Sequence, residues 1–286
     1  MPESPFLEIL AENLAASVSG RRIESIDIRQ PALLMTASPP PESFVGEFLS
    51  LPVRRGKYLI LETESRRAIV LHLMRLGRLS IVPAPASARK PAKNVSARIR
   101  FDDDSELRLV EHGTEKRARL WLAEDPDDVA ELRAIGPDPA RGGMDDAAFR
   151  TALRAESRQI KGFLTDQRAI SGIGNGLSDE ILYEARLSPL QLTRNVSDEE
   201  AARLYRATLD VLERQTSALR ASAAGALPQR EPSEHYTVHD HAGETCGRCG
   251  STIARISYAD RETYYCPGCQ TGGAPLKDRR LSKLLK

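Results

Sequence analysis

Two Cys-x-x-Cys pairs constrain this chain more than any other feature. They contain its only four cysteines, in the order Cys246-Gly-Arg-Cys249 and Cys266-Pro-Gly-Cys269. Two such pairs, sixteen residues apart, are typical of a zinc ion held by four thiolates, which leave no coordination position for water. The zinc would therefore be structural and would stabilise a module too small to have its own core. Two disulfides are the alternative, which is weaker because the N-terminus has no features of a secretory signal.

The segment between the pairs predicts a β-hairpin. Ile253–Tyr258 and Thr263–Tyr265 form two short apolar and aromatic runs, with a turn at Ala259-Asp260. Residues 246–286 carry 8 basic and 3 acidic residues, whereas the whole chain has a net charge of +1. A compact basic module is suited to contact phosphates, although a solvated basic tail would have the same composition.

Length and patterning predict at least two domains. The 286 residues and a hydrophobic content of 41% are sufficient for two cores and a small third module. Residues 22–34 and 51–122 contain many short apolar or alternating runs, which favour a β-sandwich or barrel. An Asp-, Pro- and Gly-rich stretch at 123–145 reads as a linker. No apolar run of about 18 residues is present, so we expect no membrane span. The start, Met-Pro-Glu-Ser-Pro, has no basic region and no long apolar stretch, so we expect an intracellular protein.

Helices dominate after the linker. Asp145 is a candidate cap for a helix over about 146–155, a second helix is expected over about 157–166, and Ser197 with Glu200 forms a capping box for a long third one. Three glycines within Gly172–Gly176 precede another helix start. Backbone N–H groups there could face a phosphate, but a simple turn between packed helices fits the spacing equally well.

The first three residues offer a possible nucleophile. Initiator methionine is normally removed before a small residue, so Pro2 would become a terminal secondary amine next to the Glu3 carboxyl. An α-amino group has a pKa of about 7.7–8.0, which leaves a useful neutral fraction near pH 7. Many proteins begin with Met-Pro, so this signal is weak alone. A helix is expected to follow over about residues 6–18.

Together these features resemble the formamidopyrimidine-DNA glycosylase / endonuclease VIII family of DNA repair enzymes over nearly the whole chain. Each motif alone is weak, whereas their order together with the cysteine spacing is specific. The matching motifs are Met1-Pro2-Glu3 with Pro5 and Glu8, Arg55-Gly56-Lys57-Tyr58, His72-Leu73 followed by Gly77-Arg78-Leu79, Ile160-Lys161 before Leu164-x-Asp166-Gln167, Gly172-Ile173-Gly174-Asn175 leading into Asp179-Glu180-Ile181-Leu182, and Arg261-x-Thr263-Tyr264-Tyr265-Cys266-x-x-Cys269-Gln270.

The resemblance implies an α+β multidomain fold. It places an N-terminal catalytic β-sandwich over residues 1–125, a linker over 126–145, a helix–two-turns–helix DNA-binding domain over 146–235 and a zinc-finger hairpin over 236–286. The implied partner is double-stranded DNA that contains a damaged base or an abasic site. The resemblance also implies a monomer, no membrane, and a cytoplasmic, bacterial-type location.

The resemblance also assigns catalytic roles. Pro2 would attack C1′ of the damaged nucleotide and form a covalent iminium with the opened sugar. Glu3 would move the protons of base departure and ring opening, and Lys57 would assist β-elimination. Arg261 would grip a phosphate and assist δ-elimination. These roles agree with the local chemistry of an amine beside a carboxyl and of cations that meet phosphates.

The implied DNA contacts are Arg75, Lys161, Asn175 and Arg261, and several positions depart from the family pattern. Arg75 stands where a methionine usually fills the gap left by the flipped base. Phe6 stands where the family usually has a glutamate, so a second acidic group near the amine is missing. The residues that the resemblance assigns to catalysis are all present, whereas those that read the lesion and fill the gap are altered. This predicts a divergent branch of the family whose lesion need not be 8-oxoguanine.

Other interpretations compete with a glycosylase that is also an abasic-site lyase. A non-enzymatic damaged-DNA-binding protein would explain the altered lesion-reading residues. A zinc-ribbon interaction protein would leave the N-terminal proline and the glycine turn unexplained. His235, His239, Asp240 and His241 suggest a second metal site, although their spacing matches no known one. The predicted function is the bifunctional enzyme.

Overall fold

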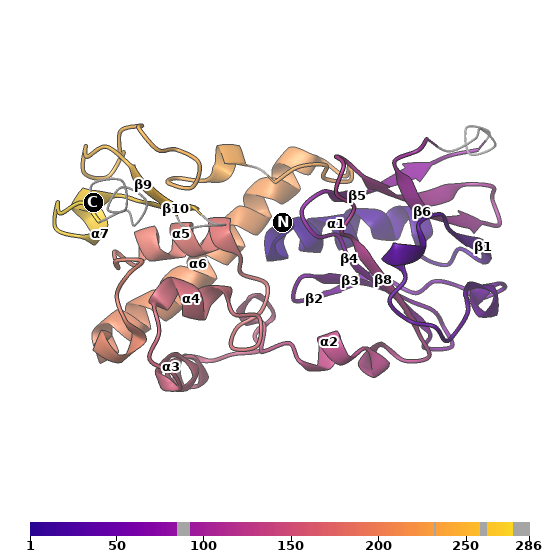
Figure 1. Ribbon diagram of the computed structural model, residues 1–286, viewed down its shortest axis with the longest axis horizontal. Coiled ribbons are helices and arrows are strands. Elements are labelled where there is room, and N and C mark those ends of the chain that lie inside the picture. Colours follow the sequence, from indigo (N-terminus) through magenta and orange to yellow (C-terminus); the bar gives the residue numbers. More distant parts are fainter. Residues whose placement is uncertain (85–91, 232, 258–261, 277–286) are drawn as a thin grey trace. The chain divides into compact units, whose positions relative to one another are not determined.

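A computed structural model describes residues 1–84, 92–231, 233–257 and 262–276. The chain forms two compact units, whose elements are labelled in Figure 1. The first unit comprises Met1–Ala134 together with Arg220–Glu231, and the second comprises Ile135–Leu219 together with the described residues from 233 onward. The segment Arg220–Glu231 therefore belongs with the N-terminal residues although it begins 86 positions after Ala134.

The first unit contains helix α1 (Ser4–Val18) and two four-stranded antiparallel sheets, in agreement with the predicted sandwich. One sheet has the order β1-β6-β7-β5 and the other β2-β3-β4-β8. The strands are β1 (Ile23–Ile28), β2 (Val53–Arg55), β3 (Tyr58–Glu62), β4 (Ala68–His72), β5 (Gly77–Val82), β6 (Val95–Phe101), β7 (Glu106–Glu111) and β8 (Arg119–Ala123).

Helix α1 (Ser4–Val18) contacts β2 and β3. Its apolar side chains are buried, and Phe6, Leu10 and Leu14 are at most 1% exposed. The helix begins at Ser4, two residues before the predicted start, because Pro5 lies in its first turn, where a missing N–H costs nothing. Strand β4 is a continuous apolar run, and its first four residues are buried as a strand covered on both faces requires.

The second unit is built on four helices around one apolar core. They are α3 (Asp146–Arg154), α4 (Ile160–Thr165), α5 (Asn175–Glu184) and α6 (Asp198–Ala223), of which the last extends into the segment assigned to the first unit. The predicted Asp145 cap is confirmed, since its carboxylate accepts the Ala148 N–H at 2.8 Å. The predicted capping box is also confirmed by reciprocal bonds between Ser197 and Glu200.

The remaining elements are short. Strands β9 (Ala254–Ser257) and β10 (Glu262–Tyr265) pair antiparallel as the predicted hairpin, and α7 (Pro267–Gln270) follows. The predicted turn between these strands lies outside the described residues. The stretch read as a linker contains the single helical turns Pro126–Asp128, α2 (Ala130–Arg133) and Pro139–Arg141. Among the helices of the described chain, none is long and apolar enough to cross a membrane.

Candidate functional site

The N-terminus enters α1 directly, and its first residues are buried. Pro2 and Glu3 are buried, whereas Met1 is 48% exposed. Glu3 precedes the first helical residue, and its carbonyl accepts the Leu7 N–H at 3.1 Å. Exposed Met1 is attached to the Pro2 nitrogen, and the backbone that follows is fixed at the start of α1. Removal of Met1 would therefore leave the Pro2 nitrogen as the terminal amine at this fixed position.

A two-residue turn between β2 and β3 carries Lys57. Gly56 adopts a φ of 56°, the left-handed conformation that glycine accepts without strain and that tight hairpins need. Buried Arg54 ties the turn to α1, since it donates to the Gly56 carbonyl at 3.0 Å and to the Glu8 carboxylate at 2.8 Å. Lys57 is only 5% exposed, so its side chain is buried, unlike that of a typical surface lysine.

The electrostatics of the terminal amine show which predicted residues surround it. Burial lowers the pKa of the Met1 amine below its ordinary value, and the positive charges of Lys57 and Arg75 add to this lowering. The carboxylates of Glu231 and Glu3 act in the opposite direction. The structure thus gathers three predicted site residues around the N-terminus, where a buried amine is more easily neutral than an exposed one.

Glu231 is a site residue that the sequence did not suggest. Its carboxylate accepts the Glu3 N–H at 3.0 Å, across 228 positions of the chain. The pKa of Glu231 is raised to about 7 by burial and by the negative charge of Glu3. No spacing rule connects residues so far apart, and the segment around Glu231 has no periodic pattern, so only the fold could reveal this contact.

His72, at the end of β4, is a neutral member of the same neighbourhood. Burial, with smaller effects of Lys57 and Arg119, lowers the pKa of His72 to about 4. Its Nδ1 accepts the Met74 N–H at 3.2 Å, which requires a deprotonated nitrogen, and its ring packs edge-on against Tyr58. The histidine of the His72-Leu73 motif therefore supports the loop that carries Arg75.

This burial predicts a pH dependence of stability. The unfolded His72 takes up a proton below about pH 6.5 and the folded one only near pH 4, so falling pH favours the unfolded chain. We expect His72 to cost the first unit about 2 kcal/mol of unfolding free energy between pH 7.5 and 5. Urea unfolding at both pH values, followed by the buried Trp121, would measure it. Equal pH dependence in wild type and His72→Gln would contradict the assignment.

The loop after β4 presents Arg75 at the surface. Met74 adopts a φ of 50°, and both Arg75 and Leu76 are exposed. The two side chains help to line a cavity of about 340 Å³ together with Met74, Glu111, Glu115 and Arg117. Buried Glu111 shapes the opposite wall by accepting the N–H groups of Arg117 and Ala118. The position at which the family usually has a gap-filling methionine is thus occupied by an exposed arginine that lines a cavity.

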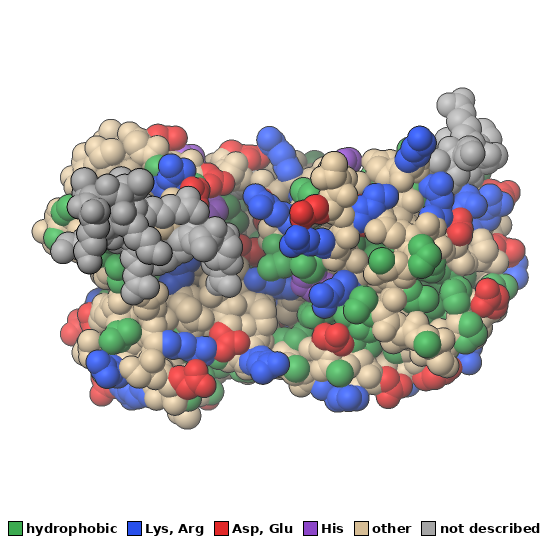
Figure 2. Space-filling model, viewed as in Figure 1, with side chains coloured by type: hydrophobic (Ala, Val, Ile, Leu, Met, Phe, Trp, Pro, Cys, Tyr) green, Lys and Arg blue, Asp and Glu red, His purple; other side chains and the backbone are tan. Residues whose placement is uncertain are grey.

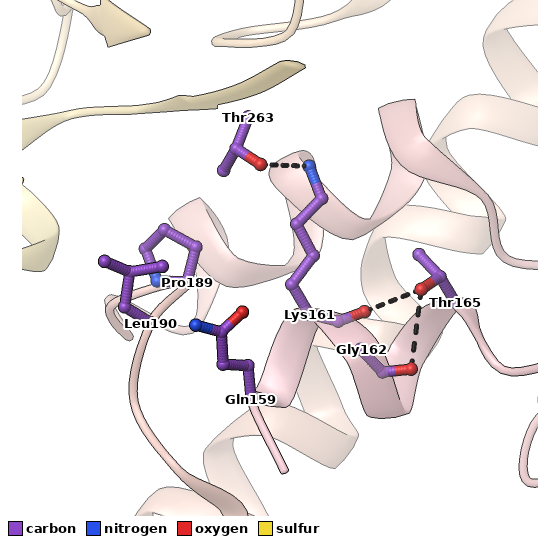
Figure 3. A pocket seen from close by; sticks show the side chains of 7 residues that line it. All are labelled: Gln159, Lys161, Gly162, Thr165, Pro189, Leu190 and Thr263. Atoms are coloured by element: carbon purple, nitrogen blue, oxygen red, sulfur yellow. Dashed lines mark hydrogen bonds between the residues drawn. The ribbon is translucent and has the colours of Figure 1, made fainter. Parts of the chain in front are cut away.

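A second cluster forms in the other unit around Lys161 and Asn175, two predicted phosphate contacts. The Lys161 ammonium bonds to Asp179 at 2.6 Å and to the Thr263 hydroxyl at 3.0 Å. The Asn175 amide donates to the Glu262 carbonyl at 2.9 Å, and its buried Oδ1 has no protein partner in the described chain. Figure 3 shows Lys161 pointing from α4 toward Thr263, beside a cavity of about 180 Å³.

Two fully buried carboxylates hold this cluster together. Asp179 accepts from Lys161, from His239 at 2.7 Å and from the Tyr264 N–H at 3.2 Å. Glu180 accepts three consecutive backbone N–H groups, those of residues 237 to 239, at 2.8 to 2.9 Å. The Asp179-Glu180 motif is therefore structural, and it joins α5 to the segment that leads to the cysteine module.

The four cysteines form the predicted metal site. The Sγ atoms of Cys246, Cys249, Cys266 and Cys269 all lie within 4.8 Å of one another. A tetrahedral zinc with Zn–S bonds of about 2.3 Å needs such separations, and four thiolates are a set that zinc prefers. The disulfide alternative fails because all four cysteines are free and the nearest sulfurs, of Cys249 and Cys266, are 3.3 Å apart.

The histidine alternative is not supported among the described residues, where no cluster other than the cysteines has metal-ligand geometry. His239 is bonded to Asp179, and His241 instead contacts Glu244 at 3.0 Å. Arg261, predicted for both catalysis and DNA binding, lies outside the described residues. On the face shown in Figure 2, basic and acidic side chains are mixed, in keeping with the net charge of +1.

Comparisons with known proteins agree with this architecture in all three parts. Residues 1–114 match the formamidopyrimidine-DNA glycosylase N-terminal domain, residues 135–225 match the H2TH domain of the same enzymes, and residues 243–272 match the zinc finger found in FPG and IleRS. A formamidopyrimidine-DNA glycosylase of Chloroflexus aurantiacus is 34% identical, covering 94% of this chain and 98% of the relative. One from a Roseiflexus species is 33% identical, covering 94% and 100%.

Solved structures show the same similarity. MutM in complex with DNA containing carbocyclic 8-oxo-G has a TM-score of 0.83 at 26% identity, over 94% of this chain and all of that one. The Lactococcus lactis Fpg in complex with DNA containing an abasic site also has a TM-score of 0.83 at 26% identity, over 94% and 99%. The similarity therefore extends through both units and is not confined to the cysteine module.

Proposed function

The chain belongs to the formamidopyrimidine-DNA glycosylase family, and on that premise we propose that it is a DNA repair enzyme that removes a damaged base and then nicks the strand as an abasic-site lyase. The observation that carries the proposal is the buried start of the chain, where Pro2 and Glu3 enter α1 and where the charges of Glu3 and Lys57 act on the terminal amine. The partner is double-stranded DNA with a damaged base or an abasic site, met in the cytoplasm.

The covalent step uses the neutral Pro2 nitrogen. Its lone pair forms a bond to C1′ of the damaged nucleotide while the C1′–base bond breaks and its electron pair leaves with the base. The nitrogen then loses its proton to the Glu3 carboxylate, its lone pair expels the ring oxygen O4′, and Glu3 passes the proton on to O4′. The product is an iminium cation at C1′ with an opened sugar.

Elimination follows from the iminium. The positive nitrogen acidifies the C2′ protons, so loss of one of them expels the 3′ phosphate by β-elimination. Lys57 lies close enough to change the pKa of the amine, and its ammonium suits the phosphate at this position. Arg261 is proposed to bind a phosphate and to assist δ-elimination. The reacting nucleotide must leave the base stack, because C1′ is not accessible within it.

The second unit is proposed to hold the DNA backbone. Lys161 and Asn175 converge on β10, at the start of a helix whose N–H groups can meet an anion. Asn175 has a carboxamide oxygen without a protein partner in the described chain, and the Lys161 ammonium is oriented by Asp179. Arg75 is proposed to contact DNA from the first unit. The proposed domain boundaries are 1–125 for the catalytic domain, 126–145 for the linker, 146–235 for the DNA-binding domain and 236–286 for the zinc-finger hairpin.

Borohydride trapping tests the proposal. The purified protein, with Met1 confirmed absent by mass spectrometry, would be mixed with duplexes carrying an abasic site, 8-oxoguanine or no lesion. We expect a covalent adduct with the abasic duplex that maps to Pro2, and base release from a damaged duplex. Binding to the abasic duplex without any adduct or base release would instead favour the non-enzymatic damaged-DNA-binding protein. The exposed Arg75 and the apolar Phe6 are the features that favour this alternative.

A further inference from the structure

Position 6 carries the apolar side chain of Phe6, and a carboxylate from a distant segment, that of Glu231, reaches the N-terminus. Phe6 is 1% exposed, and the Arg78 guanidinium lies 5.6 Å from the centre of its ring. The nearby Glu8 carboxylate is bonded to Arg54. Of the carboxylates that act on the pKa of the terminal amine, Glu231 has the largest effect and Glu3 the next.

Several bonds hold the segment that carries Glu231. Asn13 of α1 donates to the Ala226 carbonyl at 2.7 Å, and the Gln229 amide donates to the Leu79 carbonyl of β5 at 3.0 Å. Arg78 donates to the Gln229 carbonyl. The start of the segment is fixed by a two-fold ion pair of Arg220 with Glu12, at 2.7 and 2.9 Å. These bonds fix the backbone that leads to Glu231, and so they hold its carboxylate next to the N-terminal residues.

The contact is made at the peptide that joins Pro2 to Glu3. Glu231 Oε1 accepts the N–H of that peptide at 3.0 Å. The carboxylate is therefore bonded to the residue that directly follows Pro2. A secondary ammonium must lose two protons before it becomes an iminium, one to expose the lone pair and one after attack on C1′. Glu3 can take the second proton and pass it on to O4′, which leaves the first proton to another acceptor.

We propose that Glu231 is the second carboxyl group of the amine site, which positions the N-terminal peptide and accepts the first proton, the one that the Pro2 ammonium releases before it attacks C1′. This inference rests on the proposed function. In the first transfer the ammonium N–H bond breaks, its electron pair stays on nitrogen, and the carboxylate becomes a carboxylic acid. A raised pKa near 7 suits this exchange, because the group is then divided between both forms at working pH.

The test is the pH dependence of trapping. Glu231→Gln keeps an oxygen that can accept the Glu3 N–H and removes the charge, so it separates proton transfer from anchoring. The titratable and charged groups around the amine that remain in this variant are Glu3 of the N-cap, Lys57 of the β2–β3 turn, neutral His72 at the end of β4, Arg75 of the loop after β4, and Arg78 of β5.

We expect Glu231→Gln to lower the single-turnover rate of borohydride trapping on an abasic duplex at least about tenfold at pH 7.5. The carboxylate favours the ammonium form, so its loss should also move the acidic limb of the rate profile to lower pH by about one unit. Affinity for the duplex should stay within twofold of wild type, because the anchoring bond is kept.

Matched variants make the outcome decisive. Glu12→Gln makes the same chemical change at the ion pair that holds the segment, and we expect a wild-type rate and pH profile. If Glu231→Gln matches wild type in rate and pH profile while Glu231→Ala is slow, Glu231 only anchors the peptide and the inference fails. Failure of the proposed function looks different, because then the wild-type protein itself forms no adduct at Pro2.

Discussion

Replacing Pro2 with glycine is expected to reduce covalent trapping by about two orders of magnitude, the scale on which removal of one reacting group is felt in an active site. Glycine still permits removal of Met1 and leaves a terminal amine, but a primary one. Its imine is neutral until it takes up a proton, whereas the proline product is a cation as soon as it forms. Glycine also frees the backbone at a position where Pro2 is buried.

DNA binding separates loss of chemistry from loss of fold. Affinity of Pro2→Gly for an abasic duplex should remain close to that of wild type, because the proposed backbone contacts lie in the second unit. A variant with one extra residue retained before Pro2 makes the nitrogen a tertiary amide without a lone pair for attack. Trapping should then vanish. An adduct of wild-type yield in this blocked variant would place the nucleophile on another residue.

Local rules predicted the parts of the structure that depend on neighbouring residues. The Ser197–Glu200 capping box, the Asp145 cap, the β9–β10 hairpin and the cysteine cluster follow from spacings of a few residues to about twenty. The turn that places Lys57 follows from one glycine between two strand patterns. In each case the interacting residues lie close together in the sequence.

Contacts between distant segments could not be read from the sequence. The bond from Glu3 to Glu231 joins residues 228 positions apart, and no period or composition links them. Lys161 was predicted as a phosphate contact, but its pairing with Asp179 and Thr263 appears only when α4, α5 and β10 come together. Phe6 read as a lost acidic group, because a carboxylate supplied by another segment is invisible in a linear motif.

The absence of zinc is expected to unfold the cysteine module and leave the helical core intact. The module has a small apolar cluster, Tyr183, Val238, Cys246, Ile253 and Cys266, which is separate from the core of α3 to α6. Such a cluster adds only a few kcal/mol, whereas a structural zinc site adds about 10 kcal/mol or more. Cys249→Ser is the sharpest variant, because Cys249 is exposed and its replacement removes a ligand without opening a cavity.

Loss of the module should also weaken DNA binding, because β10 organises the proposed phosphate contacts. The Glu262 carbonyl accepts from Asn175 and the Thr263 hydroxyl accepts from Lys161, so a disordered β10 leaves both side chains unplaced. We expect Cys249→Ser to lose its zinc by native mass spectrometry, to lose hydrogen-exchange protection in Ala254–Ser257 and Glu262–Tyr265, and to bind an abasic duplex at least about tenfold more weakly. Protection in α6 should persist. Unchanged affinity with an unprotected hairpin would show that the module is not part of the DNA grip.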